Sequence, residues 1–268
     1  MAMECGRAHR GHLRQTFDTK LVAEIAADPL DRKADPGEGG IRHGDVPKHP
    51  AVGTLQDAVQ DLLLPGSGGS VAMLGCLAGH AVRRVAEPVS IRIALHVTGS
   101  MSRGSAVTAT ENMTAECLRL TGGRLVVHSP RDLRDFDFGK GPRSCFPVTL
   151  PDLLTIHRST SVADIETYVH VSGDAFPQGD LSALPDGPTA DQRKANRYQA
   201  AVEVTAADGT VVHSVLDTVN GYTFTPLAAA EAARRVLSGE GRPGYQTPAG
   251  LFGDGFAETI ADTRIVDL

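Results

Sequence analysis

The stretch 62-LLLPGSGGSVAMLGCLAGHAVRRV-85 decides the fold that we predict for this chain. A short apolar run ends at Pro65, a Gly/Ser loop follows, and apolar residues then recur at intervals of three and four. That recurrence marks one face of a helix, made by Val71, Leu74, Ala78, Val82 and Val85. The stretch therefore predicts a strand, a tight glycine turn and a helix, the unit that places a helix N-terminus at the carboxyl edge of an α/β sheet.

The loop Gly66-Ser67-Gly68-Gly69 admits two interpretations. The free N–H groups of a helix N-terminus attract anions, and Gly66 and Gly68 have the first spacing of the dinucleotide fingerprint G-x-G-x-x-G. Val71 occupies the third fingerprint position. The residues alone leave open both a nucleotide-binding loop and a tight structural turn.

Composition limits the classes of function. The 268 residues carry a net charge of −6 and are 41% hydrophobic, which is enough for a substantial core. Mild acidity argues against a nucleic-acid partner, and no apolar run has the length of a membrane span or of a secretory signal. The four cysteines have no CxxC spacing, so we expect a reduced, cytoplasmic protein without a metal site.

Residues 1–53 are expected to form a poorly ordered or unrelated leader. From Asp28 to Gly53 the chain is dense in Asp, Gly, Pro, Lys and Arg, and such a composition buries too little apolar surface to offset the entropy of ordering. Thr54 and Asp57 then fit a capping box, which begins a helical pattern.

The next segment is an alternating strand. Apolar residues occupy every second position from Val89 to Val97, with Arg92 and His96 on the opposite side. Such alternation is typical of a half-buried strand in an antiparallel sheet. The other expected elements are a helix over 103–120 stopped by Gly122-Gly123, strands over 146–160 and 165–171, and a helix from Thr225 to Gly239. Together they predict an α+β domain with a mixed, largely antiparallel sheet and helices on one face.

Asp208-Gly209 gives the clearest local signal, because it separates two apolar runs. A two-residue type I′ turn there would pair Val204 with His213 and Val202 with Val215. That register puts His213 on the apolar face, where we interpret it as a hydrogen-bonded core histidine.

Several segments together resemble the saccharopine dehydrogenase-like oxidoreductases over residues 62–268. They are LLLPGSGGSVAMLGCLAGHAV (62–82), MSRGSAVTATENMTAE (101–116), DFDFGKGP (135–142), FPVTLPDLLTIHRSTSVADIETYVHVSG (146–173) and NGYTFTPLAAAEAARRVLSGEGRPGYQTPAGLFGDGF (220–256). The resemblance implies an N-terminal Rossmann domain that binds NAD or NADP. It also implies a second, mixed-sheet domain used for substrate and dimer contacts.

The resemblance is incomplete, because the family's opening strand and GATGxxG-type turn have no match before Leu62. The chain is therefore expected to be the C-terminal portion of such an enzyme. Residues 54–88 would be a Rossmann remnant and residues 89–268 the substrate and dimerisation domain. The expected assembly is a homo-oligomer, or a complex with a partner that supplies the nucleotide-binding half.

The resemblance also implies a site. Gly66, Ser67, Gly68 and Gly69 would lie near the nicotinamide end of the cofactor, where a side chain would block a close approach. Asp152, Thr155 and Ser159 would line the facing sheet. The candidates for the catalytic acid are Asp152, His157, Tyr168 and His170, with core or surface roles as the alternative for each.

Two functions follow from this pattern. The first is an NAD(P)-linked oxidoreductase acting on a small molecule, and the second is a cofactor-free dimerisation or binding module, a truncated pseudoenzyme. If the Rossmann strands are missing, the helix after the glycine turn would expose its face of Val71, Leu74 and Val82.

Overall fold

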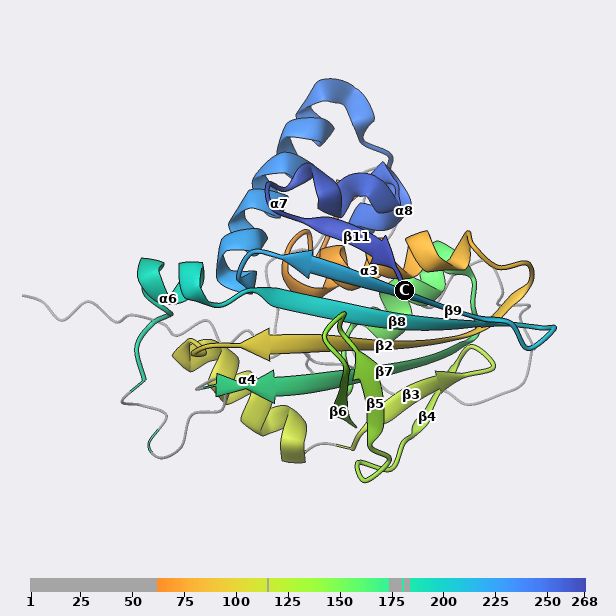
Figure 1. Ribbon diagram of the computed structural model, residues 1–268. Helices are drawn as coiled ribbons and strands as arrows, with labels where there is room; N and C mark the ends of the chain where they lie inside the picture. The colour runs from red at the N-terminus through yellow and green to blue at the C-terminus, as the bar shows by residue number, and fades with distance from the viewer. Residues whose placement is uncertain (1–61, 115, 174–179, 181–183) are drawn as a thin grey trace, which may run out of the picture. The chain divides into compact units, whose positions relative to one another are not determined.

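The computed structural model describes residues 62–114, 116–173, 180 and 184–268 (Figure 1). These residues belong to one unit, Gly44–Leu268. The expected leader over 1–53 and the helical pattern that begins at Thr54 lie outside the described residues. Within the described ranges, each helix is too short or too polar to cross a membrane.

The helices and short helical turns are α3 (Gly69–Val82), α4 (Arg103–Thr114), α5 (Asp152–Thr160), α6 (Ala190–Ala195), α7 (Gly221–Arg235), η4 (Val236–Glu240), α8 (Pro248–Phe252) and η5 (Asp254–Thr259). The strands are β1 (Leu62–Leu63), β2 (Pro88–Thr98), β3 (Leu118–Thr121), β4 (Arg124–Val127), β5 (Arg134–Asp137), β6 (Pro142–Pro147), β7 (Asp164–Ser172), β8 (Tyr198–Ala206), β9 (Val211–Thr218), β10 (Gly244–Tyr245) and β11 (Arg264–Asp267).

The main sheet is mixed and largely antiparallel, in the order β11-β9-β8-β2-β7-β3-β4. Strands β2 and β7 run parallel, whereas the other neighbours in this sheet are antiparallel, and β6 adds a short pairing to β7. One hydrophobic core joins this sheet to α3, α5, α7 and η5, so these elements share a face of the sheet. The predicted α+β fold class is confirmed.

A strand, a glycine turn and a helix are present as β1, residues 64–68 and α3, but β1 pairs in parallel with β10 in a separate two-stranded sheet and is not a strand of the main sheet. Helix α3 is also not amphipathic. Every residue from Val71 to Ala78 is buried, because the helix packs on β2, β8 and β9 and is flanked by α5, α8 and η5. The expectation of an exposed face was therefore wrong for Val71 and Leu74, while Val82 is half-buried. Segments far along the chain cover the surface that was assigned to missing strands.

Strand β2 alternates as the sequence predicts. Ile91 and Ile93 are buried in the core shared with α3, whereas Arg92 and His96 lie on the opposite face. A second, smaller core covers part of that opposite face. It joins the β5–β6 hairpin to the sheet and consists of Ala94, Phe136, Phe138, Cys145, Tyr168, Ala201 and Val215.

Three expected elements differ in the structure. The helix expected from Thr225 to Gly239 begins at Gly221, because the Asn220 side chain caps it, and it ends at Arg235 before η4. The helix that begins at Arg103 ends at Thr114, and Gly122-Gly123 forms the turn between β3 and β4. Both glycines have positive φ, 56° and 74°, which suits a hairpin turn as well as it suits a helix stop. The strand expected over 146–160 is largely α5, because Pro151 and Asp152 begin a helix whose Leu153 and Ile156 share the buried side.

The hairpin at Asp208-Gly209 exists, but its predicted register was wrong by one residue. Gly209 has a φ of 87° and the Ala206 amide donates to the Thr210 carbonyl, so the connection is a three-residue loop with a bulge. His213 therefore lies opposite Glu203 rather than Val204. A one-residue slip moves a side chain to the other face, and His213 is half exposed beside Glu203.

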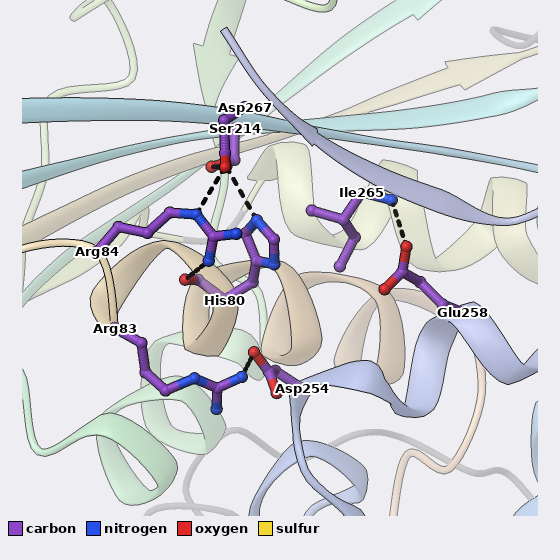
Figure 2. A network of polar contacts seen from close by, with 8 residues as sticks. All are labelled: His80, Arg83, Arg84, Ser214, Asp254, Glu258, Ile265 and Asp267. Atoms are coloured by element: carbon purple, nitrogen blue, oxygen red, sulfur yellow. Dashed lines mark hydrogen bonds and ion pairs between the residues drawn. The ribbon is translucent and has the colours of Figure 1, made fainter.

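A polar network ties the C-terminal segment to α3 (Figure 2). The carboxylate of Asp267 accepts hydrogen bonds from Ser214 Oγ at 2.7 Å and Arg84 Nε at 2.7 Å, and contacts His80 Nε2 at 2.9 Å. Arg83 also forms an ion pair with Asp254 at the start of η5. Although partial burial alone would raise it, these hydrogen bonds lower the pKa of Asp267 to about 2.

Asp267→Asn tests this network. A depressed carboxylate pKa contributes stability above the unfolded pKa near 4, and this contribution is lost as the pH falls toward 2. Because Asp267 is half exposed, we expect the variant to lose only about 0.5–1 kcal/mol at pH 7 and to match the parent at pH 2. Urea unfolding measures both, with the exposed Asp135→Asn as control; an equal loss at both pH values would contradict the network.

Candidate functional site

A cavity of about 750 Å³ lies on the helix-covered side of the sheet. Its walls come from the start of α3, helix α4, the later halves of β2 and β7, the segment 146–150 and the start of α7. The apolar lining includes Met73, Leu95, Val97, Met101, Phe146, Val148, Leu150, Val169 and Val171. The polar lining consists of hydroxyl groups and the Cys117 thiol, and no Asp, Glu, Lys, Arg or His of the described residues lines it.

The predicted glycine turn meets this cavity at Gly69 and Ser70. Its other glycines are explained by contacts within the chain. A Cβ on Gly68 would lie 2.7 Å from Thr225, and a Cβ on Gly66 would lie 2.8 Å from Val71, so the protein itself fills both spaces. The Gly69 amide donates to Thr225 Oγ1 at 2.9 Å. The turn is therefore fastened to α7.

These contacts decide which part of a dinucleotide the described residues fit. A pyrophosphate requires free amide donors or cationic side chains, whereas the Gly69 amide already has an acceptor and the described lining carries no cation. An uncharged ring with an amide substituent, such as reduced nicotinamide, matches the apolar walls and hydroxyl groups. The described lining thus fits the nicotinamide end better than the pyrophosphate, because it carries no cation and the Gly69 amide is already bonded.

Asp152 is the predicted acid that connects to the cavity. Its side chain is fully buried at the first position of α5, where Oδ2 accepts a hydrogen bond from Ser70 Oγ at 2.9 Å. Within the described residues its Oδ1 has no hydrogen-bond partner. Burial raises the pKa of Asp152 to about 6, against the lowering effect of the Ser70 hydrogen bond. Ser70 thereby links a carboxyl group that titrates near neutrality to the cavity wall.

The other predicted site residues of the segment LPDLLTIHRST, namely Thr155, His157 and Ser159, lie in helix α5 and not on a sheet that faces the cofactor. His157 Nδ1 lies 2.7 Å from the Val162 carbonyl, where the ring fastens the end of α5. Ser159 Oγ donates to the Thr155 carbonyl at 3.1 Å. Thr155 Oγ1 is buried without a hydrogen-bond partner in the described part of the chain. The expectation that Asp152, Thr155 and Ser159 line a sheet was wrong, because Pro151 starts a helix.

Tyr168 and His170 lie on the other face of the sheet from Asp152. Tyr168 Oη donates to Glu166 at 2.6 Å, and burial together with Glu166 raises the pKa of the phenol. His170 Nδ1 lies 2.8 Å from the Ser144 carbonyl. The structure therefore brings Asp152 to the cavity and separates these two candidates from it.

A hydroxyl cluster at the cavity escaped the sequence prediction. Tyr222 Oη accepts from the Ser102 amide at 2.8 Å and donates to Ser105 Oγ at 2.8 Å, and Tyr222 and Ser105 both line the cavity. The segments MSRGS and NGY carry part of the family resemblance, but no local pattern in the sequence pairs them. Their 117-residue separation conceals the contact between Ser105 and Tyr222.

Comparisons with known proteins add two distant likenesses. No protein-family model and no curated protein matches the chain. Among solved structures, apo saccharopine dehydrogenase (L-Glu forming) from Saccharomyces cerevisiae is similar with 11% identity and a TM-score of 0.44, over 73% of this chain and 72% of that one. A dehydrogenase (MviM) from Clostridium difficile is similar with 13% identity and a TM-score of 0.19, over 56% and 42%. Likenesses this distant do not establish a family.

The raised pKa of Asp152 predicts a pH-dependent stability. The native state holds this proton up to about pH 6 and the unfolded chain only to about 3.8, so burial of Asp152 favours folding below pH 4 and loses that advantage as the pH rises through 6. Asp152→Asn should remove a decline on the order of 2 kcal/mol between pH 4 and 7. Urea unfolding of both proteins across this range measures the difference; parallel profiles would contradict a raised pKa.

Proposed function

We propose that this chain is the substrate-binding part of an NAD(P)-linked oxidoreductase, and that it takes up a small, neutral, largely apolar molecule. The observation that carries the proposal is a cavity of about 750 Å³, called the neutral cavity below because its described lining has no charged side chain, whose wall includes Ser70, itself bonded to the buried Asp152. The resemblance of five segments in the order of the saccharopine dehydrogenase-like enzymes supports the same conclusion.

The lining selects a neutral ligand. Transferring an unpaired charge from water into an apolar site is far more costly than transferring a hydroxyl or carbonyl group that finds a hydrogen bond. The cavity offers Tyr222, Ser105, Thr108 and Thr149 for such a polar group and aliphatic walls for the remainder. Apolar walls also exclude water from the space between the two carbon atoms that would exchange the hydride.

A bound NAD(P)H would supply the hydride. Ser70 and Asp152 would supply the proton. When Asp152 is protonated it would donate to Ser70 Oγ, the reverse of the hydrogen bond described above, and Ser70 Oγ would pass its own proton to the substrate oxygen that gains charge as the hydride arrives. An acid with a pKa of about 6 is protonated in part of the population at neutral pH, and it takes up a new proton readily after it has given one away. A second copy of the chain, or a partner chain, would hold the pyrophosphate.

A cofactor-free binding module is the second candidate, favoured by the contacts of the glycine turn. Close contacts with Thr225 and Val71 explain why residues 68 and 66 are glycines, without any ligand. The Gly69 amide already donates a hydrogen bond to Thr225 Oγ1. In this function the cavity still binds the neutral molecule, but no hydride is transferred.

Ligand titrations test the cavity and separate the two functions. Nile red, a neutral apolar dye, should bind, and Ala109→Phe should weaken that binding at least 10-fold because residue 109 lines the cavity. Val107→Phe on the exposed side of α4 is the matched control and should bind as the parent does. Equal binding by both variants would contradict the proposed pocket.

The nicotinamide cofactors are then titrated into the full chain by calorimetry and by reduced-nicotinamide fluorescence. Binding of NADPH or NADH that Ala109→Phe weakens supports the oxidoreductase. Dye binding without any cofactor binding at millimolar concentration, alone or with a copurified partner, leaves the cofactor-free module.

A further inference from the structure

The β5–β6 hairpin lies against one face of the main sheet (Figure 1). A second cavity, of about 310 Å³, lies on that face. Its floor comes from β2, β8 and β9, one wall from the hairpin, and another from the segment before β8. Its lining consists of His96, Thr98, Phe138, Lys140, Gly141, Arg143, Ala195, Asn196, Arg197, Gln199 and Asp217. The sheet separates this cavity from the neutral cavity. The described lining of the second cavity contains charged side chains, whereas that of the neutral cavity does not.

The second cavity carries an excess of positive charge. Its carboxylate, Asp217, is paired with Arg197 Nε at 2.7 Å and accepts from Gln199 Nε2 at 3.0 Å. Lys140 and Arg143 have no ion-pair partner within the described residues. Because the charges of Arg197 and Asp217 cancel, Lys140 and Arg143 leave a net charge of about two positive units at the hairpin wall.

The backbone that presents Lys140 is organised in advance. Asp137 Oδ1 accepts hydrogen bonds from the Gly139 amide at 2.7 Å and from the Gly141 amide at 2.9 Å. Both glycines have positive φ, 86° and 90°, so the loop depends on residues without a Cβ. The tip of the hairpin therefore presents Lys140 at the cavity on a backbone that is already ordered before binding, and Arg143 follows it on β6.

The pKa of His96, on the floor of the second cavity, responds to these positive charges. The half-buried ring contacts Ser172 Oγ at 2.8 Å and Gln199 Oε1 at 3.4 Å, and it packs against His170 with centroids 4.8 Å apart. Burial lowers the pKa of His96, and His170, Arg143 and Lys140 lower it further, against the Gln199 hydrogen bond. The other charged groups at this cavity, Arg197 and Asp217, are paired with each other.

We propose that the second cavity is a binding site for a phosphate group, held by Lys140 and Arg143 above the His96 side chain. A dianion matches two cations that lack carboxylate partners, and the planar Arg143 fork suits bidentate contact with phosphate oxygens. Phosphate binding here requires neither the neutral cavity nor a nicotinamide cofactor. The site is therefore independent of the proposed oxidoreductase function.

Calorimetric titration of inorganic phosphate into the full chain tests the site, at constant ionic strength maintained with sodium chloride. We expect saturable binding, and at least a 10-fold loss of affinity in the double variant Lys140→Gln/Arg143→Gln. The matched control is Arg124→Gln/Arg131→Gln, which removes two exposed cations elsewhere and should leave the affinity unchanged. Lys140→Gln alone changes only the hairpin tip and should give an intermediate loss.

The imidazole resonances of His96 provide a second readout. Phosphate should raise the His96 pKa, because an anion beside Lys140 and Arg143 offsets the field that lowers it. Succinate at equal concentration tests the alternative of a carboxylate ligand and should bind more weakly. An unchanged His96 pKa, equal losses in the control variant, or tighter binding of succinate would each overturn the proposal.

Discussion

Helix α3 is buried from Val71 to Ala78, so the fold must cover it on every side. The sheet supplies one side, and helices from distant parts of the sequence supply the others, namely α5, α8 and η5. Gly68 can lie against Thr225 of α7 only because it has no Cβ, and the Gly69 amide bonds the same threonine. The buried helix therefore sets the positions of the start of α7, through Thr225, and of the start of α5, through the bond between Ser70 and Asp152. Both contacts lie at the wall of the neutral cavity.

The sequence predicted the elements whose signal is local. The alternation of β2 follows from residue periodicity, the turn before α3 from its glycines, and the α+β class from the mixture of predicted strands and helices. The register of His213 could not be predicted, because Asp208-Gly209 suits both a two-residue turn and a three-residue loop with a bulge. Similarly, α3 is surrounded by elements far along the chain, from α5 to η5, and no local sequence pattern indicates them.

The candidate site was partly predictable for the same reason. Tyr168 and His170 are two residues apart on one strand, so a common face was implied, but only the position of the helices decides which face holds the neutral cavity. Asp152 reaches that cavity through Ser70, a contact across 82 positions. The sheet thus divides the chemistry, with a neutral, hydroxyl-lined cavity on one face and a cationic hairpin wall on the other.

The two outermost strands of the main sheet, β4 and β11, have a consequence for self-association. Each is four residues long and carries a charged residue, Arg124 in β4 and both Arg264 and Asp267 in β11. Short, charged border strands discourage the addition of a further strand from a neighbouring molecule. Growth of the sheet from copy to copy, the route to fibrous aggregates, is thereby opposed at both borders, which leaves the broad faces and the loops for any specific assembly.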